Sequence, residues 1–188
     1  TPELLRDETG RVMEGERGLI FVHENRSNPD SRLIAVHFQR YRAVNPPAGE
    51  DKRAPIFLLA GGPGGEFTFR REMRYTQLNR LRQTRDVVVM SQRGNPRAPG
   101  LVPDFRIRSE DTLPLDKPAS IKTLSEHLRK AYTQSLAQWT DLGVDVQGYD
   151  IINIVDDVDD VRKALGYGKL VLHGCSFGSH SSFSYLTR

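Results

Sequence analysis

Three short apolar runs, each followed at once by a loop, constrain the fold of this chain more than any other feature. The runs are PIFLLA (55–60), DVVVM (86–90) and KLVLHG (169–174). A continuous apolar run of this length is typical of a strand that is buried on both faces of a sheet. Because helix-compatible segments separate the runs, we expect a mainly parallel sheet with helices on both faces.

The helical segments are polar or amphipathic. Residues 70–85 are helix-compatible, and residues 120–139 read as a long helix with Ser120 as its N-cap. In the next helix, apolar residues recur at spacings of three and four before Gly166 closes it: Ile151, Ile154, Val155, Val158, Val161 and Leu165. A further helix is expected to begin at Ser176.

Two apolar, β-branched segments precede the first of the three runs. They are GLIFVHEN (18–25) and SRLIAVHFQRYRAV (31–44), and the turn-forming stretch RSNPD lies between them. Together they predict a leading antiparallel hairpin.

Composition limits the classes of protein to which the chain can belong. The 188 residues suffice for one domain, but 37% hydrophobic content and a mean hydropathy of −0.52 suggest long polar loops or a core completed by something else. Cys175 is the only cysteine, which excludes an internal disulfide. No apolar run approaches the roughly 18 residues of a membrane span.

Charge and the first residues of the chain give weaker information. The 27 basic and 24 acidic residues leave a net charge of +3. Basic residues between 70 and 85 lack interleaved aromatics, so we expect a solvated helix face there rather than a nucleic-acid site. The chain starts TPELL, without Met or a signal-like apolar core, which leaves its location open.

The third apolar run leads into HGCSFGSH (173–180), in which Gly174, Ser176 and Gly178 form Gly-x-Ser-x-Gly. A serine at a sharp turn between a strand and a helix is an arrangement in which hydrolases expose a nucleophile. The flanking glycines remove side chains that would collide with the neighbouring strand and helix. The N-terminus of the following helix offers N–H groups to an oxyanion. We therefore predict that Ser176 is a nucleophile.

The glycine-rich segment AGGPGG (60–65) follows the first apolar run. Its glycines let the backbone direct N–H groups into a cavity, as an oxyanion hole requires. A Walker-type phosphate loop would need Lys followed by Ser or Thr after the glycines, and no such pair follows. The segment therefore favours an oxyanion hole, and a plain flexible turn is the remaining alternative.

Three motifs in this order, LLAGGPGG, VVVMSQRGNPRAPGL and YGKLVLHGCSFGSHSSFSYL, resemble the α/β-hydrolase fold. They are most similar to its proline iminopeptidase and tripeptidyl aminopeptidase branch. Members of that branch carry a His-Gly-Gly-Pro-Gly loop, an Asp-Gln-Arg-Gly loop and a Gly-Gly-Ser-Tyr-Gly elbow. The resemblance covers most of the chain and implies a serine aminopeptidase that releases N-terminal residues from peptides, without a cofactor or a metal.

The resemblance also implies roles for individual residues. Ser176 would be the acylating nucleophile, and the backbone N–H groups of Gly62 and Phe177 would form the oxyanion hole. The Gln-Arg-Gly segment (92–94) would brace the glycine loop. The Gly62–Pro63 peptide bond is a candidate for the cis form.

The chain departs from the branch at several positions. Ala60 replaces the usual histidine and Ser91 the usual aspartate, which removes hydrogen-bonding groups near the site. Phe177 replaces tyrosine but keeps the N–H group. Cys175, beside the nucleophile, is expected to be a small buried residue.

Other candidate groups are given structural interpretations. The acidic cluster of residues 156, 157, 159 and 160 lacks the glycine and ligand spacing of a calcium loop, so we expect a solvated helix face. His180 follows Ser176 by four residues and is expected to point into the body of the fold rather than act as a base. A metal site formed by His173, Cys175 and His180 is disfavoured because strand and helix directions separate them.

The base and acid of a catalytic triad are missing from the pattern. In this fold the acid and the histidine follow the serine along the chain, and none of the five histidines is well placed. Residues 1–188 are therefore expected to be the N-terminal part of one catalytic domain. A second polypeptide or a C-terminal segment would supply the acid, the histidine and the substrate-selecting cap. The strand at 169–174, expected to be central, would otherwise keep an unpaired edge.

Two further functions remain open. The same elbow serves esterases, lactonases and amidases, so the substrate is a peptide or a small acyl compound. A non-catalytic binding protein on a hydrolase framework is the other alternative.

Overall fold

The computed structural model of the chain describes residues 1–6, 9–47, 54–64, 71–95 and 120–188. The prediction that concerns Gly65 and the part of the motif VVVMSQRGNPRAPGL beyond residue 95 lie outside these residues.

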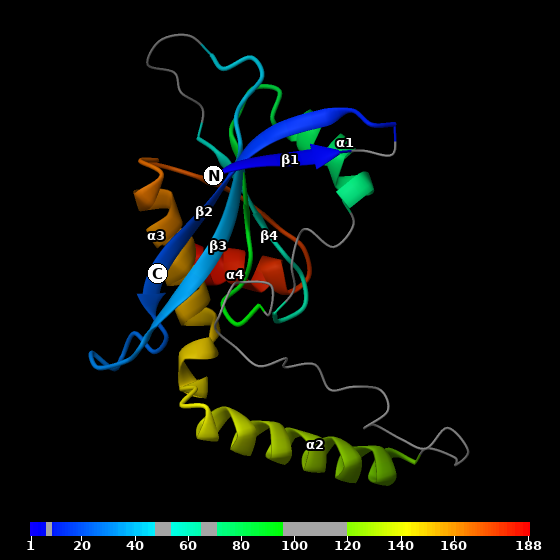
Figure 1. Cartoon of the computed structure of the whole chain (residues 1–188), viewed down its shortest axis with the longest axis vertical. Helices are drawn as coiled ribbons and strands as arrows, with labels where there is room; N and C mark the ends of the chain where they lie inside the picture. The colour runs from blue at the N-terminus through cyan, green and yellow to red at the C-terminus, as the bar shows by residue number, and fades with distance from the viewer. Residues whose placement is uncertain (7–8, 48–53, 65–70, 96–119) are drawn as a thin grey trace.

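Six strands form one mixed sheet, in the order β1-β2-β3-β5-β4-β6 (Figure 1). The strands are β1 (Pro2–Arg6), β2 (Val12–His23), β3 (Leu33–Tyr41), β4 (Ile56–Leu59), β5 (Val87–Met90) and β6 (Val171–Gly174). The pairs β1–β2, β2–β3 and β3–β5 are antiparallel, and the pairs β4–β5 and β4–β6 are parallel.

The prediction of an α/β-hydrolase fold with a mainly parallel sheet is therefore wrong. The leading hairpin is present, but its strands are much longer than β4, β5 and β6, and β1 adds a further antiparallel pair. Neither β1 nor the first half of β2 was predicted, because Glu14, Glu16 and Arg17 interrupt the apolar pattern there. The three apolar runs do form the parallel part of the sheet.

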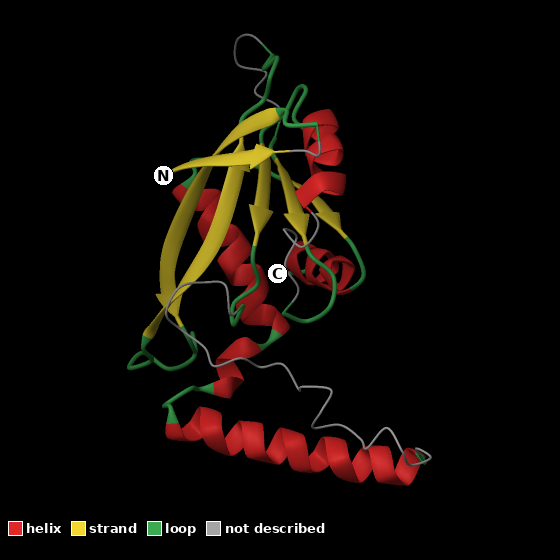
Figure 2. Cartoon of the chain, turned by 45° about the vertical axis from the view of Figure 1, so that its right-hand side comes forward, coloured by secondary structure: helices red, strands yellow, loops and turns green. Residues whose placement is uncertain are grey.

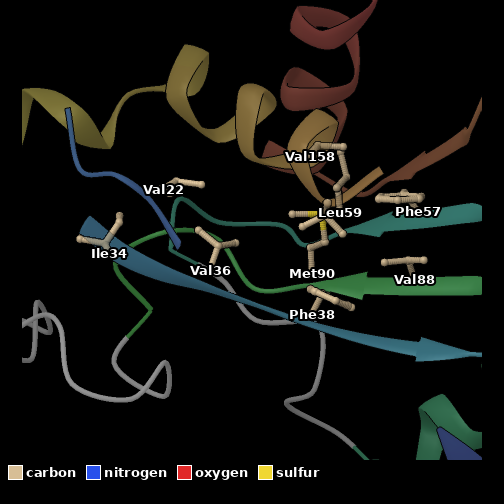
Figure 3. Close-up of a cluster of buried hydrophobic side chains, with 10 residues drawn as sticks. Val22, Ile34, Val36, Phe38, Phe57, Leu59, Val88, Met90 and Val158 are labelled. Carbon is tan, nitrogen blue, oxygen red and sulfur yellow. The ribbon is translucent and has the colours of Figure 1, made fainter. Parts of the chain in front are cut away.

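Alternation along the short strands creates two hydrophobic cores, one on each face. On one face, Phe57, Leu59, Val88 and Met90 pack against Val158 (Figure 3). On the opposite face, the intervening strand residues Leu58, Val87 and Val89 pack against the helix that follows β4. That helix contributes Tyr75 and Leu78. Both clusters are built from side chains that lie almost wholly out of water, and this burial is the main stabilising contribution.

Four α-helices and one short 3₁₀-helix complete the described structure. They are α1 (Arg71–Leu81), α2 (Ile121–Asp141), η2 (Val146–Tyr149), α3 (Ile151–Ala164) and α4 (Phe177–Leu186). Ser120 caps α2 as predicted, since its Oγ accepts a hydrogen bond from the Thr123 N–H at 3.1 Å. Gly166, with φ +76°, follows the end of α3.

The helices differ in how they contact the sheet. α3 and α4 contribute to the core on one face, and α1 covers part of the other. α2 has no buried residue and extends to one side of the strands (Figure 2). None of the helices in the described ranges is long and apolar enough to span a bilayer.

The parallel part of the sheet positions the candidate site. β4 lies between β5 and β6, and Leu59 at its end pairs with Gly174 at the end of β6. The loops that leave these three strands therefore meet at the carboxyl ends of the parallel strands, where parallel sheets commonly bind ligands. β6 is the last strand in the order rather than a central one, and within the described ranges β4 is its only partner.

Candidate active site

The backbone of Ser176 occupies an unusual conformation. It has φ 52° and ψ −118°, and it is the one non-glycine residue with positive φ in the described part of the chain. Such a conformation costs on the order of 1–3 kcal/mol and persists only where the surrounding structure imposes it. Ser176 is exposed and immediately precedes α4, and its side chain makes no capping hydrogen bond. Its hydroxyl is therefore not used to satisfy the helix terminus.

The glycines of Gly-x-Ser-x-Gly are required by close backbone contacts. A Cβ added to Gly174 would lie 2.2 Å from the carbonyl oxygen of Gly178, and a Cβ added to Gly178 would lie 2.2 Å from that of Leu59. The expected collisions with the neighbouring helix and strand are thus present. They fix the first turn of α4 against the ends of β6 and β4.

The glycine loop after β4 lies against the elbow. A Cβ added to Gly61 would lie 3.1 Å from both the Ser176 Cβ and the Cys175 carbonyl oxygen. Gly62 and Gly64 have φ +62° and +75°, a region that glycine adopts without strain. The Gly62–Pro63 peptide bond is trans, so the expectation of a cis bond is wrong.

Two backbone N–H groups beside Ser176 have no acceptor among the described residues. Gly178 donates to the Cys175 carbonyl and Ser179 to the Ser176 carbonyl, both at 2.8 Å, which leaves the Phe177 N–H unpaired within that part of the chain. The Gly62 N–H is likewise unpaired there, whereas Gly64 donates to Gln92 Oε1 at 2.7 Å. Both N–H groups that were predicted to form the oxyanion hole are therefore without an acceptor in the described part of the chain.

The Gln-Arg-Gly segment after β5 supports this loop. The Gln92 amide donates to the carbonyls of Ala60 at 3.0 Å and Gly62 at 3.4 Å, and it accepts from Gly64. The neighbouring Arg93 is wholly buried and forms a bidentate ion pair with Asp157 of α3. The expectation that this segment braces the loop agrees with these contacts.

The prediction of a solvated acidic face on α3 is wrong. Asp157 is buried, because it shares the face of the helix that packs on the sheet with Ile154 and Val161. Its neighbours are also ion-paired: Asp156 with Arg188, Asp159 with Arg162 and Lys163, and Asp160 with Arg26.

The effect of this ion pairing on a pKa is clearest at Asp159. The Arg162 hydrogen bond, with further bonds from Lys163 and Tyr185, holds the pKa of Asp159 well below its ordinary value despite partial burial. The acidic cluster therefore joins α3 to its neighbours. In the described ranges, no group of three His, Cys, Asp or Glu side chains could hold a metal ion.

The residues around the elbow are more exposed than expected. His180 lies on the surface of α4 and does not enter the body of the fold, and Cys175 is exposed rather than buried. Both lie on the part of the elbow that faces away from the elements that pack against α4, which are α3, β4 and β6. No described histidine or carboxylate is hydrogen-bonded to the Ser176 hydroxyl.

Sequence reasoning missed two features of this site. Gly61 touches the elbow, and the repeated glycines were the available signal. The pairing of Arg93 with Asp157 joins residues 64 positions apart, and the place of Asp157 on the apolar face of α3 was the signal that could have revealed it.

Comparison of the chain with protein-family models and with curated proteins finds no match. The function is therefore argued from the geometry of the site.

Proposed function

We propose that this chain carries the nucleophile of a serine hydrolase that works through an acyl-enzyme on Ser176. The observation that carries the proposal is the positive φ of Ser176 where β4 and β6 end, together with the N–H groups of Gly62 and Phe177, which have no acceptor among the described residues. A strained serine between a strand and a helix is the arrangement of a nucleophile elbow.

The chemistry begins with attack of the Ser176 Oγ on a substrate carbonyl carbon. The carbonyl oxygen becomes an oxyanion that accepts hydrogen bonds from Gly62 and Phe177, each worth about 3–4 kcal/mol to the transition state. The positive end of the α4 dipole favours the same charge. The leaving group departs with a proton, and water then hydrolyses the acyl-serine.

The proton transfers require a base and an acid that we assign to a partner. An unassisted serine hydroxyl is a poor nucleophile near neutral pH. A second polypeptide or a C-terminal segment would supply the histidine and the carboxylate and would pair with the outer edge of β6. Exposed apolar side chains on β6 and α4 support this: Val171, Phe183 and Leu186.

For the substrate we propose the N-terminal residues of peptides, as in proline iminopeptidases. This assignment rests on the resemblance of the Gly-Gly-Pro-Gly loop to that branch. The second candidate is hydrolysis of small acyl esters, lactones or amides, because Gly62 and Phe177 would contact only the carbonyl oxygen that all these substrates share. A binding protein without catalysis is the outcome if Ser176 proves unreactive.

A substrate panel tests the proposal with the complete protein. Aminoacyl anilides should be turned over faster than short acyl esters, and Ser176→Ala should abolish both activities. Ser184→Ala, in the last turns of α4, is the control and should retain them. Preferential turnover of the esters would select the second candidate, and full activity in Ser176→Ala would contradict the proposal.

A further inference from the structure

We propose that the buried Arg93–Asp157 ion pair, acting through Gln92, positions the Gly62 N–H, so that α3 sets the geometry of the oxyanion hole. The inference rests on the proposed function and adds three positioning residues to it. None of the three touches the substrate.

The first link fixes Arg93 in space. Its side chain is 0% exposed and that of Asp157 is 2% exposed. Nε and Nη2 donate to the two carboxylate oxygens of Asp157 at 2.8 and 2.6 Å, and Nη1 donates to the carbonyls of Glu24 and Gly148, each at 2.6 Å. A planar guanidinium with all these bonds has one orientation only, which a lysine could not reproduce.

Close backbone packing between Glu24 and Gly148 makes the binding site of the Arg93 guanidinium rigid. A Cβ added to Gly148 would lie 1.9 Å from the Glu24 carbonyl oxygen. The two carbonyls that Arg93 binds are therefore held next to each other by direct backbone packing. Arg93 thus ties the end of β5 to α3, to η2 and to the segment that follows β2.

The second link passes from Arg93 to its neighbour Gln92. The Gln92 side chain is buried, and both ends of its amide are used. Nε2 donates to the Ala60 and Gly62 carbonyls, and Oε1 accepts from the Gly64 N–H. Only a side chain with a donor and an acceptor on one rigid group makes all three bonds.

The third link is the loop itself. Among the described residues, no heavy atom lies within 4 Å of the position of a Cβ at Gly62 or Gly64. The Gln92 hydrogen bonds to the Gly64 N–H and the Gly62 carbonyl therefore hold this part of the loop. They use the Gly64 N–H and leave that of Gly62 for the substrate.

The consequence is a chain of fixed contacts from α3 to the reacting oxygen. An oxyanion hole works only if its donors are held in place before reaction, and a misplacement of about 1 Å can cost on the order of 10²-fold in rate. A buried ion pair contributes little to stability compared with apolar packing. Its contribution here is the orientation of Gln92.

Gln92→Met tests the second link in the complete protein. Methionine fills the same space but makes no hydrogen bond to the loop. We expect kcat to fall on the order of 10²-fold with KM little changed, because the lost interaction acts in the transition state. We also expect faster amide hydrogen exchange at Gly64, a readout that does not depend on activity.

Asp157→Asn tests the first link, and Asp156→Asn is its matched control. Asp156 is the preceding residue of α3 and pairs with Arg188, whereas Arg26 bridges Asp157 and Asp160. Asp157→Asn should lower kcat and speed exchange at Gly64, measured per folded molecule, whereas Asp156→Asn should change neither. Unchanged kcat and Gly64 exchange in folded Gln92→Met would overturn the inference. A fall in activity of Asp157→Asn that follows only the folded fraction would overturn the role of the ion pair. If wild-type Ser176 is unreactive, the proposed function fails, and Gly64 exchange still decides whether these residues position the loop.

Discussion

The carbonyl oxygen of Leu59 lies so close to Gly178 that an added Cβ would be 2.2 Å from it. Leu59 is the last residue of β4, from which the glycine loop departs, and Gly178 is in the first turn of α4. This contact holds the two halves of the candidate site, the loop and the elbow, at a fixed separation.

Gly178→Ala should destabilise the protein by about 3 kcal/mol, because the added Cβ meets backbone that cannot move away. The free energy of unfolding in denaturant measures this loss. Gly168→Ala is the control, since no heavy atom of the described residues lies within 4 Å of its Cβ position. Equal stability of the two variants would show that the elbow is not packed against β4.

Gly62→Ala should lower kcat on the order of 10²-fold while KM changes less, because alanine disfavours φ +62° and moves a donor that acts in the transition state. Steady-state kinetics of the complete protein measure the effect. Gly143→Ala introduces the same backbone strain far from the site, at φ +68° and also in open space. If both variants lose only stability and the folded fraction turns over normally, the loop is structural only.

The buried Glu24 predicts a specific loss of stability in acid. Burial opposes its ionisation, but hydrogen bonds from Arg32, Tyr149 and the Asp145 N–H outweigh burial and hold the pKa of Glu24 below its ordinary value. The stabilisation is therefore complete above the unfolded-state pKa of about 4.3 and is lost as pH falls through the lower folded-state pKa.

Glu24→Gln is the variant that tests this pH dependence. Its free energy of unfolding should lie below that of the wild type near neutral pH, and the difference should shrink as pH falls below about 4. A difference that stays constant over this range would contradict the assignment.

Local sequence patterns predicted the parts of the fold that depend on local chemistry. The run at 55–60 became β4, the run at 169–174 became β6, and Ser120 caps α2. The strand directions were not predictable in this way. The antiparallel pairing of β3 with β5, such as Phe38 with Met90, is a tertiary choice that neither segment encodes alone.

The same distinction applies to the candidate site: its locally encoded part could be predicted, and its contacts between distant segments were missed. Ser176 and its two glycines could be identified because the elbow is built within five consecutive residues. The burial of Asp157 was missed: its place on the apolar face of α3 was a local signal, but its partner Arg93 follows β5, and the helix sequence does not reveal that contact. The exposure of His180 was mispredicted, since which face of α4 is covered depends on packing against β4 and α3 rather than on the helix sequence.

The chain of residues 1–188 alone should show almost no turnover, because the loss of a triad histidine costs about 10⁶-fold in related chemistry. It should also aggregate through the outer edge of β6. Co-expression with the proposed partner, which would supply the acid and the histidine, should restore solubility and activity together. A soluble, active isolated chain whose turnover is abolished by His180→Ala would identify His180 as the base and contradict the assignment to a partner.

The most direct test of the central claim is mass spectrometry of the complete protein after reaction with a serine-directed fluorophosphonate. The account predicts one added phosphonyl group, located at Ser176 by peptide mapping, and none in Ser176→Ala. The exposed neighbouring Cys175 and the serines of α4 should stay unmodified. Labelling at another residue, or no labelling of the folded wild-type protein, would contradict the claim that Ser176 is the nucleophile.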